Sequence, residues 1–330
     1  MNAAMGEVKN SMILVDWGNT NLRVYRARRG YDLEKRGAPN NGIQQLKFFQ
    51  QKHRPVGELY AQNLHEIIGD WLEADPQAPV IMCGVIGTME GWVVVPYQQC
   101  PVGLDMLANN LFRIPNELLG VMQGRNVYIV PGIKVIEPDG RCYVMRSEET
   151  KAFGILENGP TLNGTELVCM PGTHCQWIVM NGAQIQRFGT FLTGEIFDVL
   201  CKHGSLSTFM DSTDTDMVSF DRGLDIALQG HDLLTDLHNV RGQKMTGHNP
   251  PASFRDYLSG VLMGHELLGA AKYFGQKNCV LVSDPGIKES LYKHAFARFG
   301  WTITRQMSAE DAIIAGLTTI MMAQDKRLAA

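Results

Sequence analysis

One order of elements occurs twice in this 330-residue chain, and it limits the folds that the chain can adopt. Residues 11–17 are a short, mainly apolar run closed by Asp16 and a turn at Gly18, and a partly alternating segment resumes at residues 21–28, which predicts a β-hairpin. A strand over residues 166–170, a turn at Gly172 and a strand over residues 174–180 repeat this order 154 residues later. The repeat predicts an internally duplicated protein.

Further elements are predicted from hydrophobic periodicity, turn residues and helix caps. Residues 80–97 are apolar but contain Gly84, Gly87 and Gly91, so we expect a strand, a glycine loop and a second strand instead of a membrane span. A mostly helical stretch over residues 211–274 is expected to be an insertion. The other expected strands are 31–36, 126–130, 184–188, 279–282 and 302–304, and the expected helices are 56–73, 148–157, 193–202, 287–299 and 309–322.

Strands and helices alternate in both halves, which predicts an α/β protein with two lobes and a cleft between them. We expect residues 1–160 to form an N-terminal lobe with the first glycine hairpin and an acidic helix start. Residues 161–330 are expected to form a C-terminal lobe with the second glycine hairpin and the helical insertion.

Charge and cysteine content argue against a nucleic-acid-binding protein, a membrane protein and a secreted disulfide-bonded protein. Thirty basic and 34 acidic side chains give a net charge of -4, so the chain as a whole does not attract nucleic acid or an anionic membrane. Seven cysteines contain no CxxC pair, and residues 1–10 lack a basic segment followed by an apolar one. We therefore expect a cytoplasmic protein with reduced thiols and no transmembrane helix.

Several common motifs are absent, including GxxxxGK[ST], GxGxxG after a strand, GxSxG and HExxH. The glycine turns remain, and their backbone N–H groups and hydroxyls suit a polyphosphate held from two sides, with Asp16 holding Mg²⁺ through water. An Asp-led turn that only closes a hairpin is the local alternative, and the matching turn at Gly172 favours the phosphate interpretation. The two turn sequences are Asp16-Trp17-Gly18-Asn19-Thr20-Asn21 and Pro171-Gly172-Thr173-His174.

A second charged cluster consists of Arg146, Ser147, Glu148 and Glu149. Ser147 is predicted to cap a helix whose first turn carries acids at the positive end of its dipole, and for the cluster taken by itself this structural role is the favoured interpretation. A carboxylate at this place is also suited to accept a proton from a substrate hydroxyl.

A zinc site is not predicted. Cys169, His174 and Cys175 lie close together in the sequence, but zinc normally needs four ligands and no second pair has matching spacing.

Five segments resemble, in the same order, the signature blocks of the 2-dehydro-3-deoxygalactonokinase family, and they span nearly the whole chain. The segments are Val15 to Arg23, Gly91-Trp92 with Pro96-Tyr97, Met145 to Thr150, Met170 to Trp177, and Leu192 to Glu195.

The resemblance implies a member of the superfamily of actin, sugar kinases and heat-shock ATPases, in which two ribonuclease-H-like lobes bind Mg-ATP. It implies transfer of the γ-phosphoryl group of ATP to the 6-hydroxyl of 2-dehydro-3-deoxy-D-galactonate, a small sugar acid of galactonate breakdown. Glu149 is the expected base, with Glu148 as the alternative, because the cluster follows the last strand of the first lobe. The other expected site residues are Asp16 for Mg²⁺; Gly18, Asn19, Thr20, Gly172, Thr173 and His174 for phosphate; Gly286 for the adenosine side; and Arg23, Trp92, Tyr97 and Arg146 for substrate or transferred charge.

Two positions depart from the family pattern. Ser147 stands where family members usually have glycine, and the turn ending in Gly286 begins with Ser283 where the late strand usually ends in glycine. Two other functions stay open: a phosphatase or exopolyphosphatase-like hydrolase, which would release phosphate without a sugar acid, and a non-metabolic actin-like ATPase, indifferent to sugar acids. The sequence does not distinguish galacto from gluco substrates, nor does it set the oligomeric state.

Overall fold

The computed structural model describes residues 11–27, 33–38, 41–49, 56–156, 164–210 and 215–328. Residue contacts divide the chain into two units, and each is described by itself. Unit 1 comprises Met1–Thr165, Ile178–Phe188 and Ala309–Ala330, and unit 2 comprises Glu166–Trp177 and Gly189–Ser308.

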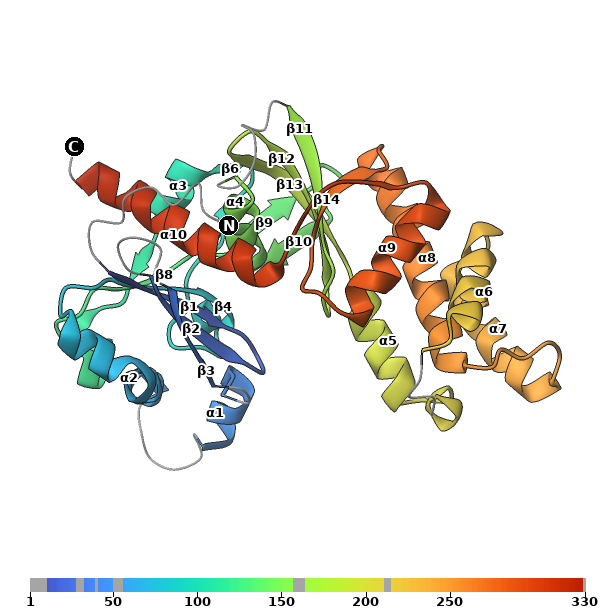
Figure 1. Cartoon of the computed structure of the whole chain (residues 1–330), viewed down its shortest axis with the longest axis horizontal. Coiled ribbons are helices and arrows are strands. Elements are labelled where there is room, and N and C mark those ends of the chain that lie inside the picture. Colours follow the sequence, from blue (N-terminus) through green and yellow to red (C-terminus); the bar gives the residue numbers. More distant parts are fainter. Residues whose placement is uncertain are drawn as a thin grey trace. The chain divides into compact units, whose positions relative to one another are not determined.

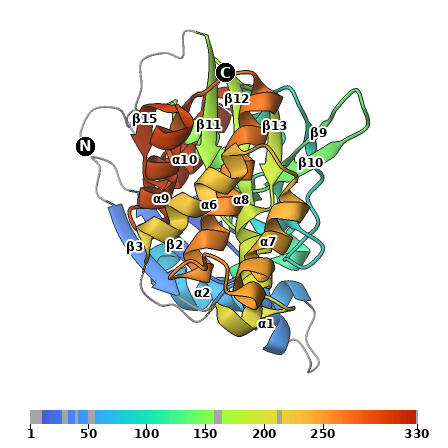
Figure 2. The same cartoon turned by 90° about the vertical axis from the view of Figure 1, so that its right-hand side faces the viewer.

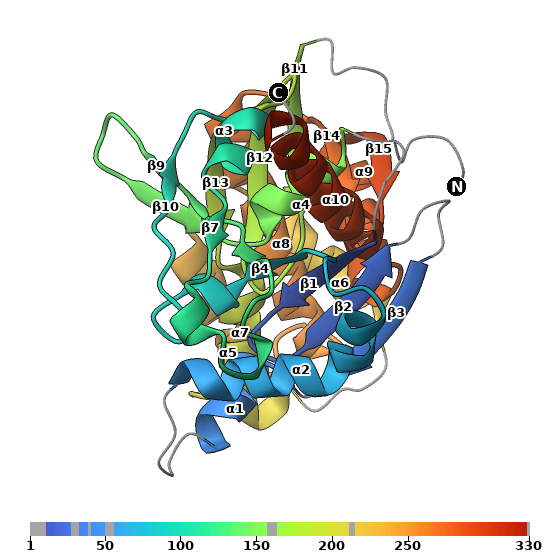
Figure 3. The same ribbon diagram turned by 90° about the vertical axis from the view of Figure 1, so that its left-hand side faces the viewer.

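Unit 1 is built on a six-stranded sheet of order β3-β2-β1-β4-β8-β7. Its first three strands are antiparallel, whereas β1, β4 and β8 run parallel. Helix α2 covers one face, and α10 crosses the other face together with α4 (Figure 1 and Figure 3). The sheet strands are β1 Met12–Trp17, β2 Leu22–Ala27, β3 Leu33–Ala38, β4 Val80–Gly84, β7 Phe112–Arg113 and β8 Val127–Ile129. The helices are α1 Ile43–Phe49, α2 Val56–Ala74, α3 Leu104–Asn109, α4 Glu148–Gly154 and α10 Ala309–Leu328.

Smaller elements complete unit 1. A three-stranded sheet has the order β10-β9-β5, and short 3-10 helices connect the larger elements. These elements are β5 Gln98–Gln99, β6 Val102–Gly103, β9 Ile133–Ile136, β10 Cys142–Met145, η1 Val85–Gly87, η2 Asn116–Leu118 and η3 Gly120–Met122.

The core of unit 1 is formed by a fully buried strand and by the apolar face of a helix. All six residues of β1 are buried, as expected for a strand covered on both faces. Tyr60, Leu64, Ile68 and Trp71 recur at spacings of three and four along α2 and pack in one core cluster with strands β1 and β2. Burial of this helix face therefore holds α2 against the sheet.

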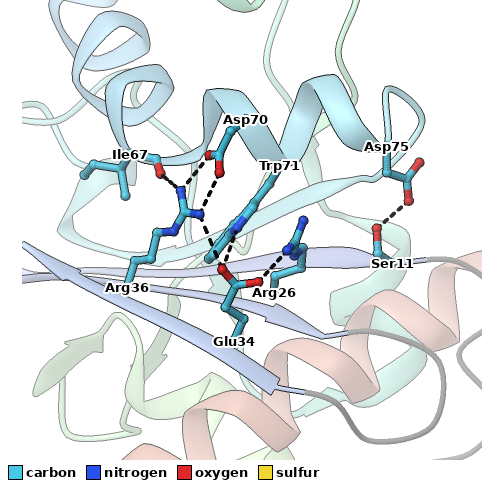
Figure 4. Close-up of polar contacts among 8 residues, drawn as sticks. All are labelled: Ser11, Arg26, Glu34, Arg36, Ile67, Asp70, Trp71 and Asp75. Atoms are coloured by element: carbon cyan, nitrogen blue, oxygen red, sulfur yellow. Dashed lines mark hydrogen bonds and ion pairs between the residues drawn. The ribbon is translucent and has the colours of Figure 1, made fainter.

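Polar contacts tie the edge strand β3 to α2 (Figure 4). Arg36 Nη1 and Nη2 donate to the two carboxylate oxygens of Asp70 at 2.6 and 2.7 Å, and the guanidinium lies 4.1 Å from the ring centroid of Trp71. Trp71 Nε1 donates to Glu34 Oε1 at 3.0 Å, and Arg26 forms an ion pair with the same carboxylate. The edge strand is thus held to the helix by bidentate and stacked contacts.

Unit 2 contains most of a sheet of order β15-β14-β11-β12-β13-β6, and strands β12 and β13 each contribute residues to both units. Helices α8 and α9 cover one face of its strands, and α6 and α7 pack against α8 (Figure 1 and Figure 2). The strands are β11 Thr165–Met170, β12 Cys175–Asn181, β13 Gln184–Phe191, β14 Asn278–Val282 and β15 Thr302–Met307. The helices are α5 Thr193–Lys202, η4 Ser207–Phe209, α6 Met217–Leu228, α7 Leu233–Thr246, α8 Phe254–Phe274 and α9 Ile287–Phe299.

The predicted α/β class and the repeated strand, glycine turn, strand, strand and helix are confirmed. The helical insertion is present as α6, α7 and α8. The expected strand over residues 31–36 appears as β3 from Leu33 onward, while residues 31 and 32 lie outside the described residues.

Two details differ from the expectations. The second strand expected within residues 80–97 is wrong, because Gly84 has a φ of 97° and the Trp92 amide donates to the Ile86 carbonyl at 2.9 Å, which folds the chain into a tight loop. Helix α10, expected in the C-terminal lobe, groups by its contacts with unit 1. The lobe boundary at residues 160 and 161 stays a prediction.

Candidate active site

The first glycine turn lies between β1 and β2 and is held by the start of α1. The amides of Gly42, Ile43 and Gln44 donate to the carbonyls of Thr20, Gly18 and Asn19 at 3.0 to 3.2 Å. A Cβ on Gly42 would lie 2.2 Å from the Asn19 carbonyl oxygen, so only glycine allows this approach.

The second glycine turn, between β11 and β12, is held in the same way. The Glu195 amide donates to the Thr173 carbonyl at 2.8 Å, and a Cβ on Gly194 would lie 2.4 Å from the Gly172 carbonyl oxygen. Thr173 and His174 are exposed, and His174 Nε2 pairs with Glu195 Oε2 at 2.5 Å. In both units, therefore, a glycine at the start of the next helix supports the glycine turn.

Asp16, the last but one residue of β1, is almost buried. Arg23 lies opposite it on β2 and donates from Nη1 to Asp16 Oδ2 at 3.0 Å. Ser147 Oγ donates to Asp16 Oδ1 at 3.3 Å, and the buried Cys83 thiol lies 3.9 Å from the same oxygen. The structure thus brings Asp16, Arg23 and the acidic helix start together.

Ser147 precedes α4, but its hydroxyl does not cap the helix as predicted. It has a φ of 87°, and its side chain makes no capping hydrogen bond. Its backbone N–H donates to Glu149 Oε1 at 3.0 Å, while its hydroxyl donates to Asp16 Oδ1. The capping prediction is therefore wrong, because the left-handed backbone and the proximity of β1 give the hydroxyl another acceptor.

Glu149 is fully buried, and its Oε2 has no hydrogen-bond partner among the described residues. Oε1 accepts from the Ser147 amide and from Thr150 Oγ1, both at 3.0 Å. Burial, together with the charge of Glu148, raises the pKa of Glu149 to about 7.

Glu148 is partly exposed and lies beside a cation. Lys151 Nζ is 3.8 Å from Glu148 Oε1. Burial lowers the pKa of Lys151, but the negative charges of Glu148 and Asp16 outweigh it and leave this pKa raised. Lys151 therefore stays positively charged beside the carboxylates, a feature that the sequence patterns did not reveal.

Arg146 and Tyr97, both expected from the sequence on the substrate side, come together. The Arg146 guanidinium lies 4.2 Å from the Tyr97 ring centroid, and its Nη2 donates to the Val95 carbonyl. Arg146 Nε and Nη1 are buried without a hydrogen-bond partner among the described residues. Buried donors of a charged group that lack an acceptor are unfavourable, and an anion bound beside them would satisfy them.

Trp92 lies in the core of unit 1. It is 5% exposed, its Nε1 donates to the Leu118 carbonyl at 3.0 Å, and its ring stacks on Tyr60 with centroids 6.4 Å apart. These contacts account for Trp92 without a ligand, and its part in substrate binding stays a prediction.

Unit 2 contains a cavity of about 430 Å³. Its walls combine the second turn and the start of α5 with residues of α8 and α9, including the cations Arg255 and Lys288. Gly286 itself is not in the lining, but it immediately precedes the lining residues Ile287 and Lys288. Its φ of 150° and ψ of -170° are accessible only to glycine, so it sets the direction in which α9 starts.

A buried carboxylate supports this cavity. Glu266 Oε2 accepts from Tyr292 at 2.9 Å and from Thr193 Oγ1, and both of these residues line the cavity. Glu266 Oε1 accepts from Trp177 Nε1 at 3.0 Å, and burial raises the pKa of this carboxyl. Glu266 thereby fixes two cavity side chains.

Cys169, Cys175 and Glu266 have ligand atoms within 4.8 Å of one another. The oxygens of Glu266 are already used by three protein donors, and only three potential ligands gather here among the described residues, so the cluster does not match a zinc site. His174, considered with these cysteines in the sequence, pairs with Glu195 instead.

Several residues of the site were missed by sequence reasoning. Gly42 had an available signal, since it stands at the start of the helix that follows the third strand of its repeat, whereas Gly194 lay in the Leu192 to Glu195 segment without a role assigned to it. Glu266, Arg255 and Lys288 belong to no local motif, and only the folded chain brings them to the cavity.

In the described part of the chain, none of the helices combines the length and apolar character needed to cross a membrane.

Comparisons with known proteins agree with one another. The family model described as 2-keto-3-deoxy-galactonokinase matches residues 16–320. The chain is 29% identical over 308 residues to the 2-dehydro-3-deoxygalactonokinase of Escherichia coli (strain K12), covering 93% of this chain and 96% of that protein. It is 31% identical over 254 residues to a protein of Rhizobium meliloti (strain 1021) named as a probable 2-dehydro-3-deoxygalactonokinase, covering 75% and 79% of the two chains.

A solved structure shares the fold across nearly the whole chain. It is a crystal structure from Sinorhizobium meliloti, described as that of a candidate 2-dehydro-3-deoxygalactonokinase, with 27% identity and a TM-score of 0.79. The similarity covers 94% of this chain and 98% of that one.

Proposed function

This chain belongs to the 2-keto-3-deoxy-galactonokinase family, and we propose that it transfers the γ-phosphoryl group of ATP to the 6-hydroxyl of 2-dehydro-3-deoxy-D-galactonate. The observation that supports this chemistry most directly is the pair of glycine turns, each held by a glycine at the start of the following helix. The Gly18 N–H donates within its turn to the Asn21 carbonyl at 2.9 Å, so phosphate would be bound by the other N–H groups and the hydroxyls of the two turns, which the supporting glycines hold in place.

Unit 2 is the proposed nucleotide side. Gly172, Thr173 and His174 would contact phosphates, and the cavity beside them has the volume and mixed lining typical of a small-molecule site. Arg255 and Lys288 place two positive charges in that lining against the one carboxylate of Asp256, and this balance suits an anionic nucleotide. Gly286 contributes by starting α9 in the required direction.

Unit 1 is proposed to hold the metal and to supply the general base. Its first glycine turn would contact phosphate through Gly18, Asn19 and Thr20. Asp16 fits Mg²⁺ held through water: it offers a carboxylate, and its partner Arg23 has a half-exposed side chain that can turn toward a ligand. No cluster of three metal-ligating side chains surrounds Asp16 among the described residues, which suits an ion that keeps most of its waters. When bound, Mg²⁺ supplies positive charge to the nucleotide phosphates.

Glu149 is the proposed general base. A pKa of about 7 matches a group that must be ionised near neutral pH and still accept a proton. Its unpartnered Oε2 is the atom that would take the proton from the substrate hydroxyl. Because the side chain has no exposed surface, this step requires that substrate binding uncover Oε2, and Glu148 is the alternative base.

Arg146 is the proposed binder of the substrate carboxylate. Its Nε and Nη1 are buried donors without a protein acceptor among the described residues, and either of them could donate to a substrate carboxylate. Stacking on Tyr97 fixes the plane of the group. Arg23, across the strand pair, would stabilise charge on the transferred group.

The seven cysteines are free thiols, which supports a place in the reducing cytoplasm.

The test is ADP formation by the purified protein with Mg-ATP and a panel of acceptors. We expect ADP only with 2-keto-3-deoxy sugar acids, and nuclear magnetic resonance of the product should locate phosphate on C6. Comparable ADP formation with glucose, with glycerol or without an acceptor would overturn the assignment, and release of inorganic phosphate alone would indicate a hydrolase.

A paired variant tests the carboxylate assignment. Arg146→Lys keeps the charge but loses the planar fork, so KM for the sugar acid should rise by roughly 10-fold or more while KM for ATP changes little. Arg113→Lys, at an exposed residue of β7 that donates to Asn126, is the matched control and should leave both values unchanged. An unchanged sugar-acid KM in Arg146→Lys would reject the role of Arg146.

A further inference from the structure

We propose that Ser147 is a positioning residue whose hydroxyl orients the Asp16 carboxylate, and that a strained backbone is kept at this position to place that hydroxyl. This inference rests on the proposed function of Asp16. It concerns a residue that contacts neither substrate nor nucleotide in the scheme above and acts through the carboxylate that it holds.

The backbone at Ser147 is unusual. Among the described residues, only Ser147 and Asn249 combine a side chain with a positive φ, at 87° and 47°. Asn249 is exposed, and asparagine tolerates the left-handed region. Ser147 is buried. Its Cβ makes a φ of this sign sterically unfavourable, whereas glycine has no Cβ and would adopt it without strain. Strain of this kind persists only where the surrounding structure enforces it.

The side chain of Ser147 is not used for the usual purpose of a serine before a helix. A capping serine accepts a hydrogen bond from an amide in the first helical turn, and no such bond is present. The hydroxyl instead lies 3.3 Å from Asp16 Oδ1 and 3.6 Å from the Cys83 thiol. Glycine would relieve the backbone but could not supply this contact.

Ser147 joins the two carboxylates that the proposed mechanism needs. Its hydroxyl donates to Asp16 and its backbone N–H donates to Glu149, so one residue links the end of β1 to the start of α4. The other strong partner of Asp16 is Arg23, whose side chain is 46% exposed. Without the serine hydroxyl, the partner that Oδ1 keeps among the described residues is the Cys83 thiol at 3.9 Å, so the orientation of the carboxylate depends on the half-exposed Arg23 at Oδ2.

Two variants separate the hydroxyl from the strain. Ser147→Ala removes the hydroxyl and keeps a Cβ at the positive φ, whereas Ser147→Gly removes both. We expect kcat to fall by roughly 10-fold in both variants, and the affinity for Mn²⁺, used as a probe of the metal site with a non-hydrolysable ATP analogue, to fall by a similar factor. The Tm of Ser147→Gly should exceed that of Ser147→Ala by about 2 to 4 °C.

Asn249→Gly is the control. It removes the other positive-φ side chain at an exposed site, so kcat and Mn²⁺ affinity should stay at the wild-type values. If Ser147→Gly keeps the wild-type kcat and Mn²⁺ affinity, Ser147 does not position Asp16. If the wild-type protein binds Mn²⁺ with the nucleotide but phosphorylates no sugar acid, the proposed function fails, whereas the metal-binding comparison still decides the role of Ser147.

Discussion

Gly154 of α4 and Gly316 of α10 lie where these two helices touch backbone to backbone. A Cβ on Gly154 would lie 2.8 Å from the Gly316 amide nitrogen and 1.9 Å from the Ala312 carbonyl oxygen, and a Cβ on Gly316 would lie 1.9 Å from the Thr150 carbonyl oxygen. Because α4 carries Glu148 and Glu149, this close crossing also sets the position of the proposed base.

Gly316→Ala should destabilise the protein. The new methyl group meets backbone atoms that cannot move without separating the helices, so we expect the free energy of unfolding to fall by about 2 kcal/mol or more. Chemical denaturation measures the loss. Gly242→Ala in α7 is the control, because nothing lies within 4 Å of its added Cβ, and it should be neutral or stabilising by about 0.5–1 kcal/mol. Equal effects of the two substitutions would contradict the close crossing.

Asp16→Asn should nearly abolish turnover while the fold is retained. The amide has almost the same volume and still accepts a hydrogen bond from Ser147, but it lacks the charge that would hold the metal. We expect kcat to fall by about 10²-fold or more, with an unchanged circular dichroism spectrum. A variant that keeps wild-type kcat and the same dependence on Mg²⁺ would show that this turn is only structural.

Glu149→Gln should reduce kcat by about 10²-fold, the lower end for a positioned base, because a loose phosphoryl-transfer transition state depends less on proton removal. Binding of ATP should change little. Glu148→Gln provides the matched comparison, since it removes the neighbouring carboxylate at a partly exposed position. Steady-state kinetics of both variants identifies the base: unchanged kcat in Glu149→Gln together with a large loss in Glu148→Gln would transfer the role to Glu148.

Glu149 should also make stability depend on pH. Its pKa is raised from 4.5 to about 7, so the native state binds a proton more tightly than the unfolded state does. The stability that this proton contributes is fully present below about pH 4.5 and is lost as pH rises through 7, by about 3 kcal/mol in total. Thermal melts of Glu149→Gln and wild type should show the variant gaining relative stability across this window, and a constant difference would contradict the raised pKa.

Gly194→Ala should weaken ATP binding. A Cβ at this position would lie 2.4 Å from the Gly172 carbonyl and 2.9 Å from the Thr173 carbonyl, so the second glycine turn must move away from the start of α5. Because phosphate contacts depend on accurate geometry, we expect a loss of ATP affinity of roughly 10-fold or more, measured by calorimetry. Gly242→Ala serves again as the control, and an ATP affinity equal to wild type would argue against phosphate binding at this turn.

The sequence by itself determined the elements that depend on local patterns. The hairpins at Gly18 and Gly172 follow from apolar runs interrupted by turn residues, and α2 follows from apolar residues spaced by three and four. The ordered motif blocks were also visible; they resemble a known family, which the family model confirms, and the kinase chemistry was what that resemblance implied. Such signals survive in the sequence because they arise from neighbours along the chain.

Only the tertiary structure decided which distant groups meet. Ser147 stands at the position of a helix cap, but its hydroxyl donates to Asp16, which lies 131 positions away in the sequence. The contact between Gly154 and Gly316, and the support that Glu266 provides to Thr193 and Tyr292, join segments that no periodicity relates. Strands of two residues, such as β5 at Gln98–Gln99, are too short for any alternation to show. The physical reason is common to all of these cases: a pattern records which face of an element is buried, whereas the partner on that face is chosen by packing of the whole chain.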